Sequence, residues 1–305
     1  MDNSIPTDIL PDGLPRILPP SENGIFQAVL TLPESEPALL GIVSALLDRE
    51  VKKVTLRNND APSRDKDAKR EEYDVNCVVE GEGDQCDVEM QASPMEGDNR
   101  KNDHRNIKWR SAYNLCDLHA NQSGRGLRYG NFARSYQVML CNYSTSANDH
   151  DLVERYTLRN PKGEELCDAV TAIFVDLAMA GEIAKKPVAG MAKIEMWTVF
   201  FALADKPEYS ALIAEITKQT EEIAVAYETL VSISKSPEER SRFRSRRIWL
   251  QDREHEHAVW KDEGRAEGLA EGEQSANQKW QSVVADKDAL IAELRARLGE
   301  TNPQN

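Results

Sequence analysis

The sequence is poor in positive charge and in long apolar runs. Its 305 residues carry 52 Asp and Glu against 38 Lys and Arg, for a net charge of −14. Such a chain does not bind nucleic acid through general basicity, so any contact with DNA needs a local basic patch or a bound metal ion. No apolar run reaches the roughly 20 residues that span a bilayer, and we therefore expect no membrane partner.

Cysteine is also scarce, and familiar cofactor motifs are missing. The five cysteines form no CxxC pair and no zinc-type spacing. Several fall among apolar residues, which is typical of reduced core thiols, and the N-terminal stretch lacks the regions of a secretory signal. There is no P-loop and no G-x-G-x-x-G stretch. These features predict a cytoplasmic protein that does not rely on a nucleotide cofactor bound through those motifs.

The most informative stretch is YDVNCVVEGEGDQCDVEMQ, residues 73–91. Alternating residues on both sides of a Gly-rich centre predict a β-hairpin. Its strands are expected at 73–80 and 85–91, with a turn centred on Glu82-Gly83. This register places Asp74 opposite Gln91 and Asn76 opposite Glu89.

Because side chains alternate along a strand, the hairpin has an apolar face and a polar face. The polar face holds Asp74, Asn76, Asp87, Glu89 and Gln91. Like charges repel there, and an isolated buried carboxylate is costly, so a divalent cation would stabilise this face. The alternative is a solvated outer face, where acids are common. A slip of one residue in the register would divide the set between the two faces.

A basic segment follows the acidic hairpin. Helical spacing predicts a helix over 100–122, with one side formed by Arg105, Trp109, Tyr113, Cys116 and Ala120. Its first half concentrates basic residues, namely Arg100, Lys101, Arg105, Lys108 and Arg110. Next to a metal-binding face, this segment is suited to hold DNA phosphates. A solvated helix surface is the alternative interpretation.

The rest of the chain divides into an α/β part and a helical part. The Pro-rich composition of residues 1–20 predicts a flexible N-terminal segment, and the apolar spacing of residues 23–47 predicts two short helices. Further strands are expected at 51–56, 135–143, 154–158 and 169–177. Helices are expected at 191–203, 211–232 and from Pro237 to about 278.

The C-terminal part has two repeating features. Glu-Gly pairs recur with a period of four over residues 263–272, which lines the glycines along one helix face. Beyond them, an a/d seam predicts a short coiled coil over 279–299, followed by a disordered tail at 300–305. The seam residues are Val284, Ile291, Leu294 and Leu298, and Lys287 breaks the seam. Because the tail offers this seam, we expect a homodimer through the C-terminal helices.

These motifs together resemble a known family. An Asp, a turn and then D-V-E-M-Q at 87–91 are similar to the core of the PD-(D/E)XK nucleases. More narrowly, the chain resembles the recombination-promoting nucleases, or PD-(D/E)XK nuclease family transposases. That likeness also rests on the Arg105 and Tyr113 helix, on a Gly126…Tyr129 loop and on the Glu-Gly tail, and it covers residues 21–273.

The resemblance implies an α/β fold with a restriction-endonuclease-like mixed sheet flanked by helices. The nuclease-like domain would occupy 21–180, and an all-α extension with the Glu-Gly repeats would occupy 181–278, before the short coiled coil at 279–299.

The resemblance also implies roles for individual residues. Asp74 and Glu89 would bind Mg²⁺, Gln91 would stand where the superfamily more often has Lys, and Asp87 and Tyr113 would be accessory. The implied activity is metal-dependent DNA endonuclease cleavage linked to recombination. Family members commonly open with an Asp followed by an aromatic-Lys pair, whereas this chain has N-G-I-F-Q at 23–27. This difference leaves open a catalytically degenerate relative that binds DNA or protein through its helical tail.

Overall fold

The computed structural model describes residues 10, 13–57, 74–81, 83–93, 105–122, 131–145 and 150–300. Residues Arg100 and Lys101, the loop with Gly126 and Tyr129, most of the predicted N-terminal segment and residues 301–305 lie outside these ranges. The chain forms two compact units, Met1–Phe243 and Arg244–Asn305. The domain boundaries derived from the sequence stay a prediction.

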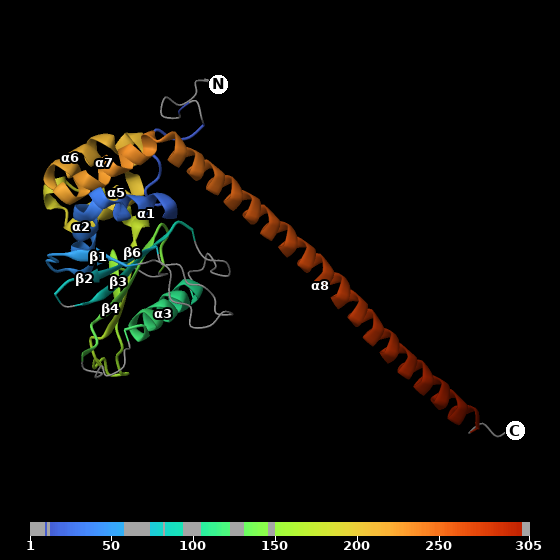
Figure 1. Ribbon diagram of the computed structural model, residues 1–305. Coiled ribbons are helices and arrows are strands. Elements are labelled where there is room, and N and C mark those ends of the chain that lie inside the picture. The colour runs from blue at the N-terminus through green and yellow to red at the C-terminus, as the bar shows by residue number, and fades with distance from the viewer. Residues whose placement is uncertain are drawn as a thin grey trace. The chain divides into compact units, whose positions relative to one another are not determined.

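A six-stranded mixed sheet forms the centre of the first unit, in the order β1-β2-β3-β4-β6-β5 (Figure 1). Its strands are β1 (Val54–Leu56), β2 (Val75–Val79), β3 (Gln85–Gln91), β4 (Ser135–Cys141), β5 (Val153–Tyr156) and β6 (Val170–Asp176). The central strands β3, β4 and β6 run parallel, and the outer pairs are antiparallel. Central parallel strands are covered on both faces, which explains the almost continuous apolar runs of β4 and β6.

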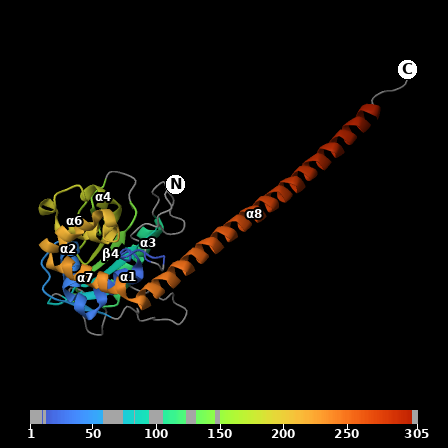
Figure 2. The same ribbon diagram turned by 90° about the horizontal axis from the view of Figure 1, so that it is seen from above.

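Helices cover both faces of this sheet, which confirms the α/β fold predicted from the sequence. One face carries α3 (Arg105–Ala120), which contacts β3, β4 and β6. The other face packs against a group of helices that contact one another (Figure 2). They are α1 (Asn23–Thr31), α2 (Glu36–Leu47), α4 (Ala180–Ile183), α5 (Lys193–Leu203), α6 (Ser210–Gln219) and α7 (Glu221–Lys235).

Two hydrophobic cores correspond to these two faces. The larger core joins the apolar residues of β2 and β3, such as Val88, to Phe26 of α1 and Trp197 of α5. The smaller core lies under α3 and joins Ile107 to Phe174 of β6. Helices that follow residue 180 therefore contribute to the same core as the sheet.

The hairpin register differs from the prediction by two residues. Asn76 pairs with Asp87, and not with Glu89. The reason lies in the turn, where Gly81 and Gly83 have φ of 95° and 75°, a conformation that favours glycine. These glycines close a four-residue turn between Val79 and Asp84. A shift by two residues keeps every side chain on its predicted face.

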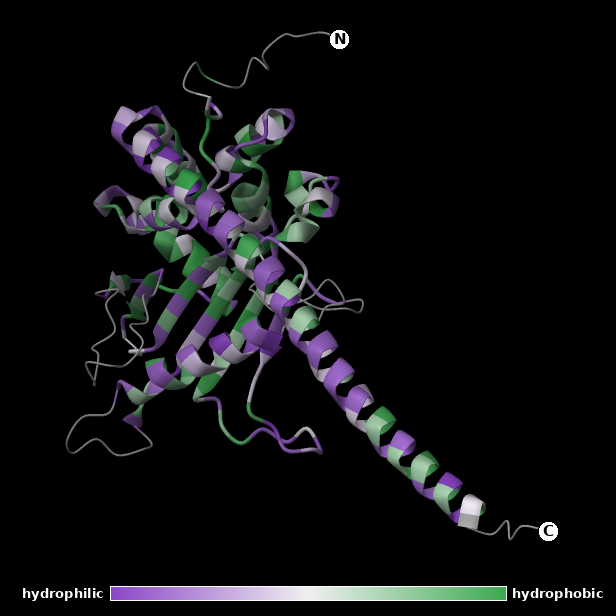
Figure 3. Cartoon of the chain, turned by 90° about the vertical axis from the view of Figure 1, so that its right-hand side faces the viewer, coloured by the Kyte–Doolittle hydropathy of each residue, from purple (hydrophilic) through white to green (hydrophobic). Residues whose placement is uncertain are grey.

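The C-terminal helices also differ in their bounds. The predicted helix 211–232 is interrupted at Thr220, whose φ and ψ of −134° and 105° are extended, and this separates α6 from α7. The last helix, α8 (Pro237–Glu300), is 64 residues long and does not end near residue 278. At 1.5 Å per residue it measures about 95 Å. Hydrophobic residues occur among hydrophilic ones along its length, as the colours of the cartoon show (Figure 3).

Within the described ranges, no single helix is both long and apolar enough to cross a bilayer. One pair, Asn23–Thr31 with Pro33–Leu47, meets the criterion on length and composition alone and is bent by 76°.

Candidate active site

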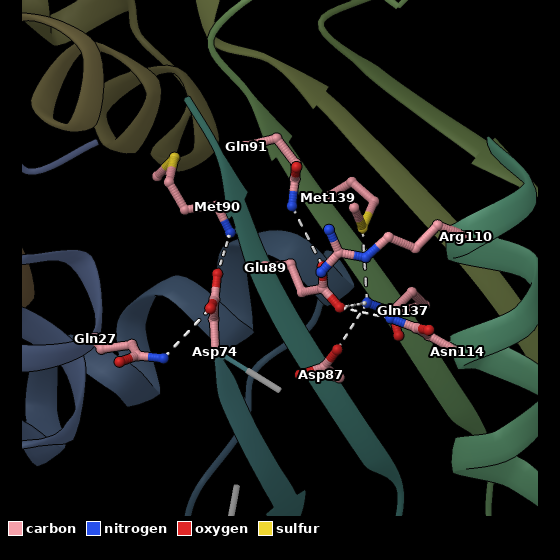
Figure 4. A network of polar contacts seen from close by, with 10 residues as sticks. All are labelled: Gln27, Asp74, Asp87, Glu89, Met90, Gln91, Arg110, Asn114, Gln137 and Met139. Atoms are coloured by element: carbon pink, nitrogen blue, oxygen red, sulfur yellow. Dashed lines mark hydrogen bonds and ion pairs between the residues drawn. The ribbon is translucent and has the colours of Figure 1, made fainter. Parts of the chain in front are cut away.

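Three polar residues of β3 project toward α3 in the middle of the sheet. Asp87, Glu89 and Gln91 alternate with apolar residues, so they share the face that α3 covers (Figure 4). All three are buried, and the two acids are 0% exposed. Two acids at this depth require partners or protons, because an isolated buried charge is unstable.

Glu89 finds its partners on α3. Arg110 donates from Nη2 to Oε2 at 2.7 Å, and Asn114 donates from Nδ2 to Oε1 at 2.7 Å. The two residues are one helical turn apart and therefore lie on the same side of α3. Gln91 adds a longer contact from Nε2 to Oε2 at 3.4 Å. Both carboxylate oxygens of Glu89 thus accept hydrogen bonds.

Asp87 is held by the neighbouring strand. Gln137 stands beside it in the β3–β4 register and donates from Nε2 to Oδ2 at 2.7 Å. The same Nε2 lies 3.4 Å from Oε1 of Glu89. Gln137 therefore links the two acids of β3.

Asp74 directly precedes β2 and is fixed from two sides. Its Oδ2 accepts the backbone N–H of Met90 at 2.9 Å, which ties it to β3. Its Oδ1 accepts a hydrogen bond from Nε2 of Gln27 at 3.3 Å, so α1 also reaches this site. Asp74 lies near enough to Asp87 and Glu89 for its charge to act on both.

The electrostatics of the site are dominated by burial and by repulsion between the acids. Burial, followed by the charge of Glu89, raises the pKa of Asp87 well above its usual value. Burial also raises the pKa of Glu89, with Asp74 adding to the increase, although the guanidinium of Arg110 opposes it. The site therefore favours either a bound proton or an additional cation.

The donor set fits an oxygen-loving divalent ion. Four buried side-chain oxygens around the acids have no hydrogen-bond partner among the residues that the structure describes. They are Asn76 Oδ1, Asp87 Oδ1, Asn114 Oδ1 and Gln137 Oε1. In the described part of the chain, no group of three or more His, Cys, Asp or Glu residues forms a ready metal cage. Mg²⁺ typically uses one or two carboxylates and keeps several waters, so this set suits Mg²⁺ better than it suits zinc.

A comparison with protein families decides how this fold is classified. The model of the PD-(D/E)XK nuclease family transposases matches residues 22–258, which is most of the chain. The chain belongs to this family. The resemblance found in the sequence is thereby confirmed. No curated protein and no solved structure matches the chain.

The family's opening motif differs here, and the structure places the difference at the acids. Where the family commonly has Lys after the aromatic residue, this chain has Gln27, which donates to Asp74. Gln91, which the sequence resemblance places where the superfamily more often has Lys, contacts Glu89. Both amides can form hydrogen bonds, but neither supplies a positive charge.

The basic residues predicted on α3 separate into different surroundings. Arg110 joins the carboxylates, whereas Lys108 lies over the ring of Tyr156, 5.7 Å from its centroid. Tyr113, predicted as accessory, is on the exposed side of α3, and Arg105 is exposed as well. The side predicted from helical spacing is therefore mainly the solvent side. The buried side holds Ile107, Ser111, Asn114, Leu115 and Leu118.

Sequence reasoning missed Asn114, Gln137 and a His–Asp pair. Gln137 had a signal, because it is a lone amide inside an apolar strand. Asn114 had only its spacing of four from Arg110. His150 Nε2 lies 2.7 Å from Oδ2 of Asp176, which aligns through β4 with Gln91. Nothing local in the sequence indicates that contact.

Proposed function

We propose that this chain is a metal-dependent DNA endonuclease that hydrolyses phosphodiester bonds during DNA recombination. Membership of the nuclease family supports a nuclease function. The observation that carries the finer proposal is a cluster of three acids under a basic helix, the half-buried Asp74 and the buried Asp87 and Glu89, beside four oxygens without a partner among the described residues. A cytoplasmic location goes with the proposal, since DNA is the substrate.

In this proposal Asp74 and Glu89 hold Mg²⁺, which supplies an activated water and charge neutralisation at the phosphate. Gln91 orients the attacking water through its amide. Asp87, whose raised pKa favours the protonated form, is placed to hold a proton near the reacting atoms. Gln137 and Asn114 keep the two acids of β3 in position.

Arg110 supplies the positive charge that Gln91 does not. It is 32% exposed, so it is able to contact a phosphate as well as Glu89. Arg105 and Lys108 extend the basic surface for DNA, and Arg100 and Lys101, which lie outside the described residues, stay predicted DNA contacts. These contacts position the strand without reading its sequence.

A homodimer through α8 is part of the proposal. On the single helix the four seam residues are exposed, namely Val284, Ile291, Leu294 and Leu298. Trp280, four residues before Val284, is exposed too and extends the seam by one position. A second copy would bury them in a coiled coil. Two active sites would then be available for cutting two strands.

A second candidate is a relative that binds DNA or protein without cleaving. Both oxygens of Glu89 are engaged by Arg110 and Asn114, and amides replace both family lysines. In this case the carboxylate would have a structural role and the helical tail would carry the function.

Plasmid nicking in Mg²⁺ and in EDTA tests the proposal. The chain is expected to cut only with the metal, and Asp74→Ala and Glu89→Ala should each lose cutting by at least about 100-fold. Asp168→Ala is the control, because this acid is exposed and pairs with the exposed Arg134. Equal cutting by site variants and control would contradict the assignment. No cutting by the folded chain with any divalent ion would favour the second candidate.

A further inference from the structure

A cavity of about 250 Å³ is lined by residues of α3 that neighbour, in the helix, those that hold Glu89. Helix α3 contributes residues both to the acid site and to this cavity. Arg110 and Asn114 contact Glu89, whereas the adjoining Ser111 and Leu115 line the cavity. The opposite wall comes from Tyr156 at the end of β5, Leu158 after it, and Phe174 of β6.

The walls of this cavity are largely apolar, and two of its polar groups bear on the choice of ligand. Ser111 is 1% exposed, and no described residue forms a hydrogen bond with its hydroxyl oxygen. A buried hydroxyl without a partner is destabilising, so this position calls for a polar atom from a ligand. The second group is Lys108, whose ammonium lies over the ring of Tyr156. An apolar cleft with a few placed polar groups is the usual form of a ligand site.

We propose that this cavity binds one nucleobase of an unpaired DNA strand. A base has flat apolar faces and a polar edge. A face suits one of the two aromatic rings, Tyr156 or Phe174, which stand edge-to-face at 85°. The polar edge suits the hydroxyl of Ser111. The attached phosphate carries the charge that complements Lys108. A purely apolar ligand would leave Ser111 unpaired and would make no use of the lysine.

The inference rests on the proposed function and narrows its substrate class. A base inside a duplex stacks on its neighbours and pairs with its complement, so it enters such a cavity only after leaving the helix. Single strands and locally unpaired sites present their bases freely. The cavity therefore selects single-stranded or unpaired DNA next to the acids.

Binding measured without cleavage tests this proposal. The probes are a labelled oligothymidylate of about twelve nucleotides and a strand of equal length and charge that carries abasic sites throughout. By fluorescence anisotropy in EDTA, the full-length chain should bind the strand with bases at least about tenfold more tightly. Tyr156→Ala should remove most of this difference, and Tyr156→Phe should keep it, because the ring remains.

Leu166→Ala is the matched control, because Leu166 is 78% exposed in the segment after β5 and does not line the cavity. Its preference for bases should equal that of the unchanged chain. Equal affinity for the two strands, or an unchanged preference in folded Tyr156→Ala, would overturn the proposal. If Tyr156→Ala does not fold, Leu158→Ala provides the same test on the same wall.

The outcome separates this inference from the nuclease proposal. Base-dependent binding that needs Tyr156, without any metal-dependent cutting, would retain the cavity assignment and reject the nuclease. Metal-dependent cutting by a chain that binds the strand with bases and the abasic strand equally would retain the nuclease proposal and reject the cavity assignment.

Discussion

Replacing Arg110 with methionine is expected to destabilise the metal-free protein by about 2–3 kcal/mol. Removing one partner of a buried ion pair costs about 3–5 kcal/mol, and Glu89 is 0% exposed with Arg110 at 2.7 Å. We expect a smaller loss of stability than for a fully buried pair, because Arg110 is 32% exposed and solvent screens its interaction with Glu89. Asn114 also continues to donate to Glu89. For a unit of this size, the melting temperature should fall by about 4–12 °C.

Thermal unfolding in EDTA at about pH 8 measures this effect. The control is Arg134→Met, which breaks an ion pair of the same 2.7 Å distance whose side chains are 45% and 68% exposed. Arg134→Met should lower the free energy of unfolding by less than about 1 kcal/mol. Equal losses in the two variants would refute the reasoning, because burial of Glu89 would then add nothing to the ion pair. A larger rise in melting temperature on adding Mg²⁺ to Arg110→Met would support Glu89 as a metal ligand.

Three further predictions concern pH, catalysis and packing. In EDTA the free energy of unfolding should fall as pH rises from the ordinary carboxyl range near 4 through the raised pKa of Asp87, because the folded state keeps a proton that the unfolded state releases. Asp87→Asn should flatten that decrease in denaturant titrations; an unchanged slope would contradict it. Gln91→Ala should lower kcat for DNA cleavage by about 100-fold with the melting temperature unchanged, and undiminished kcat would exclude a role in orienting water. Gly41→Ala should cost about 1–3 kcal/mol, because its Cβ would lie 2.5 Å from Cβ of Glu222, whereas Gly181→Ala meets open space and should cost less in the same unfolding assay.

The faces of the hairpin were predictable because alternation is a local property. Asp87, Glu89 and Gln91 share a face in any register that shifts by an even number of residues. The register itself depended on the turn, where Gly81 and Gly83 both adopt positive φ. The sequence indicated glycine there, but it did not determine which residues the turn would enclose.

Contacts between distant elements were not predictable in the same way. Gln137 reaches Asp87 across a parallel pairing, and such pairings join residues 50 positions apart. Helical spacing identified a side of α3 with Trp109 and Tyr113 but did not tell whether that side is buried. Packing decided this, since Ile107 and Leu115 fill the smaller core and leave the aromatic residues exposed.

The charge balance of the site connects its departures from the family to its geometry. Gln27 and Gln91 form hydrogen bonds with Asp74 and Glu89, as lysines could, but they leave the negative charge uncompensated. Arg110 then carries the neutralising charge, and it does so from α3 and not from the strand that bears Glu89. A guanidinium remains charged at any working pH, whereas a buried lysine can lose its proton. Cleavage that relies on Arg110 would therefore take its pH dependence from Asp87 and Glu89 and not from a basic group.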